Sequence, residues 1–184
     1  MRVVTGSAKG RKLKVPIGQD IRPMTDMIKQ AIFNVLGPLD ETDRILDLFA
    51  GSGSMGIEAL SRGAGSADFV EMEAHAVAII RENLTACRFT ESSRVYRDEA
   101  QHALGRFARD GERFTVIFVD PPFRVADEQE RLLKGLPDVL GENGTIVLRL
   151  PTRVAAPSIK RLELTKTGRY GDSLVLYYQF AENE

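Results

Sequence analysis

Residues 45–56 read Ile-Leu-Asp-Leu-Phe-Ala-Gly-Ser-Gly-Ser-Met-Gly and constrain the fold more than any other segment of the chain. A run of mostly apolar residues leads into a glycine-rich turn, and a segment suited to a helix follows. Glycines let a backbone approach a ligand closely, and the first turn of a helix offers free N–H groups. The segment therefore predicts a buried strand, a ligand-binding turn and the start of a helix.

Short apolar runs alternate with segments of helical period from Arg44 onward, which is the pattern of repeated βα units in a parallel sheet. We expect strands at residues 45–50, 67–71, 94–97, 115–120 and 145–150, and their apolar character suits strands that are covered on both faces. Two helix faces should pack on this sheet: Ala100, Ala103, Leu104, Phe107 and Ala108 form one, and Ile79, Ile80 and Leu84 mark the other. The predicted fold class is α/β.

The two ends of the chain add smaller elements. Residues 159–165 and 174–180 are strand-like runs, and the turn-rich segment 166–173 between them predicts a terminal antiparallel hairpin. Thr25 is suited to cap a helix that ends at Gly37-Pro38 and has an apolar face of Ile28, Ala31, Ile32, Val35 and Leu36. We expect one domain over residues 1–184, with an N-terminal extension at 1–38 and a core at 44–184.

The charge of the chain is uneven. The net charge is −1, yet residues 1–30 hold seven Lys and Arg against two Asp, which predicts a polyanionic partner at that end; a solvated basic tail is the alternative. The N-terminus lacks the apolar core of a signal peptide and no apolar run reaches membrane length, so we expect a cytoplasmic protein. The single cysteine, Cys87, fits a reducing compartment and a packing role.

The glycine-rich turn admits two kinds of ligand. Gly51, Gly53 and Gly56 match the dinucleotide pattern G-x-G-x-x-G, and Glu71, twenty residues after Gly51, could accept the ribose hydroxyls of a dinucleotide or of another adenosine ligand. Asp47 favours the second kind, because a carboxylate within a strand needs a cationic or hydrogen-bonding partner, and an amino-acid ammonium group would serve. A neighbouring loop N–H is the alternative partner.

Asp120-Pro121-Pro122-Phe123 follows a predicted buried strand, at the edge where ligands bind in open α/β sheets. The Asp120 carboxylate and the Pro121 carbonyl can accept the two N–H bonds of an exocyclic base amine, since prolines fix the turn and remove competing donors. Phe123 can stack on the base, which must first be unstacked from its neighbours. The motif thus predicts methyl transfer to an amine by positioning and electrostatic stabilisation; a proline-rich turn is the alternative.

Weaker signals lie further along the sheet. Asp98 ends the third predicted strand and could accept from an adenine amino group, with Glu99 and Ala100 around the ring, although a helix cap explains it equally well. His75 and His102 are isolated from each other in the sequence, so we predict no metal site and assign them to helices or the surface.

Together these segments resemble the bacterial RsmD-type 16S ribosomal RNA (guanine-N2) methyltransferases along nearly the whole chain. The resemblance rests on the first thirteen residues, on 22–26, 31–36, 46–53, 56–64, 69–71 and 120–123, and on Arg-Tyr-Gly-Asp-Ser at 169–173. It implies a class I, Rossmann-like methyltransferase domain and S-adenosylmethionine as the donor, without a metal. It also implies 16S ribosomal RNA as the acceptor, within an assembling or assembled small subunit, and we expect a monomer.

The resemblance also implies which residues act. The donor would be held by Arg22, Thr25, Asp47, Phe49, Ala50, Gly51, Ser52, Gly53, Glu71, Met72, Asp98, Glu99 and Ala100. The catalytic set would be Asp120, Pro121, Pro122 and Phe123, and the RNA-facing hairpin would present Arg2, Lys9, Arg11 and Lys12. The chain departs from the family pattern at Met27 and Gln30, where arginine and glutamate are frequent, and at Arg149, where an acidic residue is common.

Three other functions compete with this prediction. An amino-methyltransferase acting on adenine N6 of DNA, or on another RNA, would use the same Asp120 motif, but the short loops leave little room for a recognition segment. A nicotinamide-dependent oxidoreductase predicts an apolar residue in place of Asp47. A non-catalytic RNA-binding assembly factor would keep the basic end while losing the donor-binding segment, which is intact here.

Overall fold

The computed structural model describes residues 1–16, 24–121 and 126–181, without the side chains of residues 126–130. In this part of the chain seven strands form one sheet in the order β3-β2-β1-β4-β5-β7-β6. The strands are β1 Arg44–Leu48, β2 Ser66–Glu71, β3 Ser93–Arg97, β4 Phe114–Val119, β5 Leu140–Pro151, β6 Leu162–Tyr170 and β7 Ser173–Phe180. Strands β1 to β5 pair in parallel, and β7 pairs antiparallel with β5 and β6. The predicted α/β class and terminal hairpin are confirmed.

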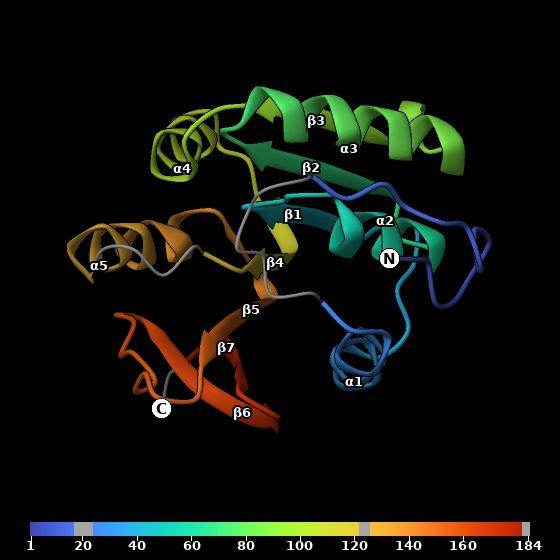
Figure 1. Ribbon diagram of the computed structural model, residues 1–184. Coiled ribbons are helices and arrows are strands. Elements are labelled where there is room, and N and C mark those ends of the chain that lie inside the picture. The colour runs from blue at the N-terminus through green and yellow to red at the C-terminus, as the bar shows by residue number, and fades with distance from the viewer. Residues whose placement is uncertain (17–23, 122–125, 182–184) are drawn as a thin grey trace.

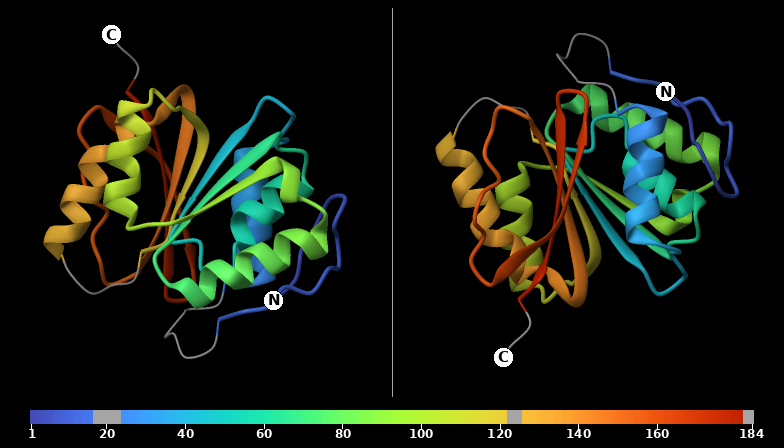
Figure 2. Two further views of the ribbon diagram at one scale, coloured as in Figure 1. Left: turned by 90° about the horizontal axis from the view of Figure 1, so that it is seen from above. Right: turned by 90° about the horizontal axis from the view of Figure 1, so that it is seen from below.

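Helices cover both faces of the sheet, as Figures 1 and 2 show. Helices α1 (Asp26–Leu36), α2 (Ser54–Ser61) and α3 (Ala74–Cys87) lie on one face, while α4 (Ala100–Arg109) and α5 (Ala126–Gly135) lie on the other. Short 3₁₀ turns, η1 (Thr90–Ser92) and η2 (Leu136–Asp138), lead into β3 and β5. Each face has its own apolar core, with the strands contributing alternate side chains to the two.

The helices follow the sequence patterns closely. Thr25 caps α1, since its hydroxyl accepts a hydrogen bond from the Ile28 N–H at 3.2 Å, and the helix ends at Gly37 as predicted. Its buried face differs from the predicted one: Ile28 and Ile32 are buried, but so are Lys29 and Phe33, whereas Val35 is half-buried. The predicted packing faces of α3 and α4 are confirmed, and Cys87 is buried.

The terminal hairpin is tighter than predicted. Strand β6 continues through residues 166–170, and Gly171 and Asp172 alone form the turn. The expectation of a loop over residues 166–173 is therefore wrong in extent, because pairing with β7 overrides the turn-like composition of that segment. A two-residue turn beginning with glycine is typical of such hairpins.

The N-terminal segment folds back on itself and packs against α2. Arg2 and Lys12 form an antiparallel bridge, flanked by the hydrogen bond from the Val3 N–H to the Arg11 carbonyl at 2.9 Å. This arrangement confirms the predicted hairpin, although as a single bridge and not as two regular strands. In the described residues, no helix combines the length and the apolar character that crossing a membrane requires.

The Glu58 carboxylate of α2 holds this segment in place. It accepts the Val4 N–H at 2.8 Å and the Thr5 N–H at 3.0 Å, and it pairs with Arg62 at 2.9 Å and with Lys29 at 3.4 Å. Lys29 and Glu58 are both fully buried, and burial lowers the pKa of the lysine while the adjacent carboxylate opposes that shift. The N-terminal segment is thus held in place by the charged side chains of Lys29, Glu58 and Arg62, which it covers.

Candidate active site at the carboxyl edge of the sheet

The carboxyl ends of the parallel strands bring the predicted site residues together. Strand β1 lies between β2 and β4, so Asp47 of β1 has Glu71, the last residue of β2, on one side and Asp120, which follows β4, on the other. The three residues come from segments separated by 24 and 49 positions in the sequence. Burial is the main cause of the raised pKa of Asp47, and the two neighbouring carboxylates add to it.

Asp47 is the most constrained of these carboxylates. It is 4 % exposed, and its Oδ2 atom accepts the Gly56 N–H of α2 at 3.0 Å. Burial raises its pKa to about 8, the Gly56 hydrogen bond opposes that shift, and the charges of Asp120 and Glu71 add to it. A buried carboxylate with two other carboxylates beside it favours a cationic ligand, because an opposite charge stabilises its ionised form. The sequence left a loop N–H and a ligand ammonium group as alternative partners; the structure supplies the N–H, and the ammonium group stays a prediction.

The turn after β1 adopts the conformation that its glycines permit. Gly53, the N-cap of α2, is left-handed with φ of 76°. Gly56 is limited by packing, because an added Cβ atom would lie 2.4 Å from the Phe69 ring. Phe49 also has a positive φ of 61°, an unfavourable conformation for an aromatic residue and one that the sequence did not reveal. Residues 49–53 therefore form a shaped turn with Ala50, Ser52 and Gly53 buried and Phe49 and Gly51 half-buried.

Glu71 connects this turn to β2. One carboxylate oxygen accepts the Gly51 N–H and the other accepts the Glu73 N–H, both at 2.9 Å. The contacts fix the carboxylate at the mouth of the glycine turn, and its predicted role with ribose hydroxyls stays a prediction. The adjacent Met72 is 60 % exposed, which is unusual for a large apolar side chain and is consistent with the rim of a ligand site.

Asp98 is engaged by the helix that follows it. Its Oδ1 atom accepts the Glu99 N–H at 2.9 Å and lies 2.8 Å from Nδ1 of His102, while Oδ2 lies 3.4 Å from Arg106. Asp98 is not the helix cap that the sequence left open beside the adenine role, because Glu99 is the N-cap of α4 and no side-chain cap hydrogen bond is present there. Ala100 is buried as the first residue of α4. The adenine contacts of Asp98, Glu99 and Ala100 stay predictions.

Asp120 forms a bidentate ion pair that the sequence did not predict. Nε of Arg149 lies 2.9 Å from Oδ1 of Asp120, and Nη2 lies 2.6 Å from Oδ2. Pro121 is buried beside it, whereas Pro122 and Phe123 lie outside the described residues. Pro121 also lines a small apolar hollow of about 50 Å³, together with Leu132, Leu133 and Val154 among others.

Asn83 of α3 is a second residue that sequence reasoning missed. Its side-chain oxygen accepts the Lys14 N–H at 2.8 Å, and its amide donates to the Lys14 carbonyl at 3.0 Å and to the Ser52 carbonyl at 2.9 Å. The side chain therefore joins the N-terminal segment to the glycine turn. A polar residue between Ile80 and Leu84 on a buried helix face was the available signal.

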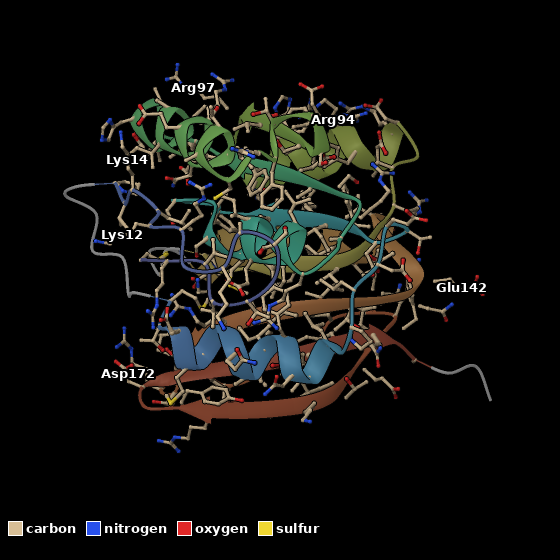
Figure 3. All side chains as sticks on the ribbon, turned by 90° about the vertical axis from the view of Figure 1, so that its right-hand side faces the viewer. Lys12, Lys14, Arg94, Arg97, Glu142 and Asp172 are labelled. Atoms are coloured by element: carbon tan, nitrogen blue, oxygen red, sulfur yellow. The ribbon has the colours of Figure 1, made fainter. Side chains whose placement is uncertain are left out.

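The basic N-terminal segment lies over α2 and α3, with hydrogen bonds from Ser7 and Ala8 to Ser61 and from Lys14 to Asn83. Arg2, Lys9, Arg11 and Lys12 are all exposed, and Arg2 pairs with Asp26 at 2.7 Å. Figure 3 shows Lys12 and Lys14 on the same side of the molecule as Arg97 at the end of β3, and on the side opposite Glu142. Thr25 is the cap of α1, and Arg22 lies outside the described residues. Within those residues, no group of three or more metal-ligating side chains is assembled.

Comparison with known proteins gives consistent matches. A family model described as "Conserved hypothetical protein 95" matches residues 1–179. The chain is 40 % identical to "Putative rRNA methyltransferase YlbH" of Bacillus subtilis (strain 168), over 97 % of this chain and 98 % of that protein. It is 37 % identical to "Ribosomal RNA small subunit methyltransferase D" of Escherichia coli (strain K12), over 78 % and 68 %. The solved structure of "Putative methyltransferase yhhF from Escherichia coli" superposes with a TM-score of 0.85 at 32 % identity, covering 98 % and 97 % of the two chains.

Proposed function

The chain belongs to the RsmD-type family that the conserved hypothetical protein 95 model describes, and from this premise we propose that it methylates the exocyclic N2 amine of a guanine in small-subunit (16S) ribosomal RNA. S-adenosylmethionine is the methyl donor. The observation that carries the proposal is the adjacency of β1 and β4, which sets the buried Asp47 beside the partly exposed Asp120.

The residues around Asp47 fit the donor. Burial and two neighbouring carboxylates disfavour the ionised form of Asp47. The ammonium group of the methionine moiety would stabilise that form, because it carries the opposite charge. The turn of Gly51, Ser52 and Gly53 would take the rest of that moiety, and Glu71 would accept from the ribose. Phe49, Ala50, Met72 and residues 98–100 would complete the donor site, with Arg22 and Thr25 covering it from the N-terminal side.

Asp120 and Pro121 would receive the acceptor. The guanine N2 amine has two N–H groups, which would donate to the Asp120 carboxylate and to the Pro121 carbonyl. Pro122 and Phe123 would hold the ring. The bound donor supplies a sulfonium-activated methyl group. Because the amine lone pair is delocalised into the base, the protein must chiefly align the nitrogen and stabilise the positive charge that develops on it. Asp120 does both, since its carboxylate orients one N–H and is negatively charged.

The RNA itself would be bound outside this pocket. Arg2, Lys9, Arg11 and Lys12 are exposed, and Lys12 lies on the same side of the molecule as the end of β3, so these residues would offer a basic surface to phosphates. The net charge of −1 disfavours binding to long naked RNA, so we propose an assembling or assembled small subunit as the substrate, which adds protein contacts. We further propose that the enzyme acts as a monomer in the cytoplasm.

Transfer of labelled methyl from S-adenosylmethionine to small ribosomal subunits, free ribosomal RNA and duplex DNA tests the proposal, with nucleoside mass analysis of the products. The wild-type protein should yield N2-methylguanosine from subunits or RNA. Asp120→Asn should lower the rate at least about 100-fold and leave affinity for S-adenosylhomocysteine nearly unchanged. N6-methyladenine from DNA would instead establish the adenine amino-methyltransferase, and no transfer to any acceptor would refute the proposed activity.

A further inference from the structure

Arg149 approaches the proposed catalytic carboxylate from within the protein. Its side chain is 6 % exposed, whereas that of Asp120 is 31 % exposed. Both oxygens of Asp120 receive a hydrogen bond from the guanidinium, at 2.9 Å from Nε and at 2.6 Å from Nη2. The cation is therefore the buried member of the pair, and the carboxylate is the member that a ligand can reach.

The sheet fixes the relative position of the two residues. Strands β4 and β5 are parallel neighbours in which Val119 pairs with Leu148, so Asp120 and Arg149 are the next residues along each strand. Arg149 is also paired with Val175 of β7, within a ladder that continues to Pro151. Backbone pairing with β7 thus restrains Arg149, whereas Asp120 lies just beyond the last residue of its strand.

This geometry fits the needs of an amine acceptor site. A bidentate guanidinium fixes the plane of a carboxylate, and each carboxylate oxygen retains a second lone pair for another donor. The pair also sets a positive charge against the carboxylate of Asp120. Without Arg149, the side chain of Asp120 would lose both of these hydrogen bonds.

We propose that Arg149 is a positioning residue for methyl transfer, which locks the Asp120 carboxylate in the plane and orientation that receive the base amine. The inference rests on the proposed function. Arg149 acts through Asp120 and contacts neither the donor nor the acceptor, so its removal should lower kcat while leaving donor affinity intact.

Two variants separate positioning from charge. Arg149→Met removes both hydrogen bonds, and we expect kcat at saturating donor and RNA to fall roughly 100-fold. Arg149→Lys keeps the charge but cannot form the planar fork, so kcat should fall about tenfold. Both should bind S-adenosylhomocysteine within about twofold of the wild-type protein by calorimetry. Because loss of a buried ion-pair partner can unfold a protein, the lysine variant decides the question if the methionine variant is unfolded.

Arg44→Lys is the matched control. Arg44 begins β1 at the opposite edge of the sheet and pairs with Glu112 at 2.7 Å, so its replacement perturbs an ion pair without touching the site. This variant should retain the wild-type kcat. A folded Arg149→Lys variant with wild-type kcat overturns this inference but not the proposed function. The same holds if the variant loses methylation activity only because it binds the donor more weakly. A wild-type protein that transfers no methyl to any acceptor overturns the proposed function, and the inference with it.

Discussion

Replacing Asp47 by asparagine should stabilise the donor-free protein and weaken donor binding. Burial raises the pKa of Asp47 to about 8, whereas the ordinary value is 3.8. At pH 7 the native group therefore holds its proton, and the unfolded chain has released it. Ionisation favours the unfolded state by 1.36 kcal/mol for each pH unit above the ordinary pKa, or roughly 4 kcal/mol at pH 7.

The sign of the effect gives the variant a distinctive pH signature. For an acid with a raised native pKa, stability is complete below pH 3.8 and is lost as the pH rises toward 8. Asparagine cannot ionise, and its side-chain oxygen can still accept the Gly56 N–H. The variant should thus exceed the wild-type free energy of unfolding by about 4 kcal/mol at pH 7 and by less than about 1 kcal/mol at pH 4.

Urea unfolding at pH 4, 5, 6 and 7 measures this difference, with Asp110→Asn, an exposed aspartate at the end of α4, as the control. A concentration of S-adenosylhomocysteine that saturates the wild-type protein should raise its free energy of unfolding and leave that of the Asp47 variant nearly unchanged. The reason is that stabilisation by a ligand grows with the ratio of its concentration to its Kd. Equal stabilities at pH 7, or a difference that grows on acidification, would refute the assignment of Asp47 as a desolvated acid.

Three further changes test other parts of the structure. Glu58→Gln should cost about 3 kcal/mol or more in urea unfolding, since the buried Lys29 and the half-buried Arg62 lose their carboxylate partner, and hydrogen exchange should quicken in residues 4–5. Gly6→Ala should release the N-terminal turn to proteolysis, because its Cβ atom would lie 1.7 Å from the Ser61 carbonyl oxygen; Gly10→Ala, with a similar positive φ and open space, should cost only about 1 kcal/mol. Glu71→Ala should weaken S-adenosylhomocysteine binding about tenfold in titration calorimetry, and unchanged affinity would remove it from the donor site.

The sequence predicted those features that depend on local pattern. An apolar run before glycines identified β1 and the turn at residues 49–53, and helical spacing identified the packing faces of α3 and α4. The Thr25 cap and the Gly37 end of α1 were readable for the same reason, because capping involves residues within one turn. Local patterns also marked Asp47 as a polar group within a strand and Asp120 as one at a strand end.

Contacts between distant segments could not be read from the sequence. Lys29 was expected outside the apolar face of α1, yet it is fully buried because Glu58, 29 residues away, compensates its charge. Asn83 joins Lys14 to Ser52 through hydrogen bonds that span 69 and 31 positions. The turn-like residues 166–170 became strand because β7 offered a pairing partner. The burial of Lys29, the hydrogen bonds of Asn83 and the strand at 166–170 each depend on a partner that is distant in the sequence and becomes a neighbour only in the folded protein.

The sequence by itself determined the α/β class and indicated the candidate site residues, since strand periodicity, glycine conformation and side-chain type are properties of short segments. The tertiary structure alone decided how those residues combine. The order β2-β1-β4-β5 set Asp47 between two carboxylates and placed Arg149 against Asp120, because the register of adjacent strands, and not distance along the chain, fixes which side chains meet at the edge of a sheet.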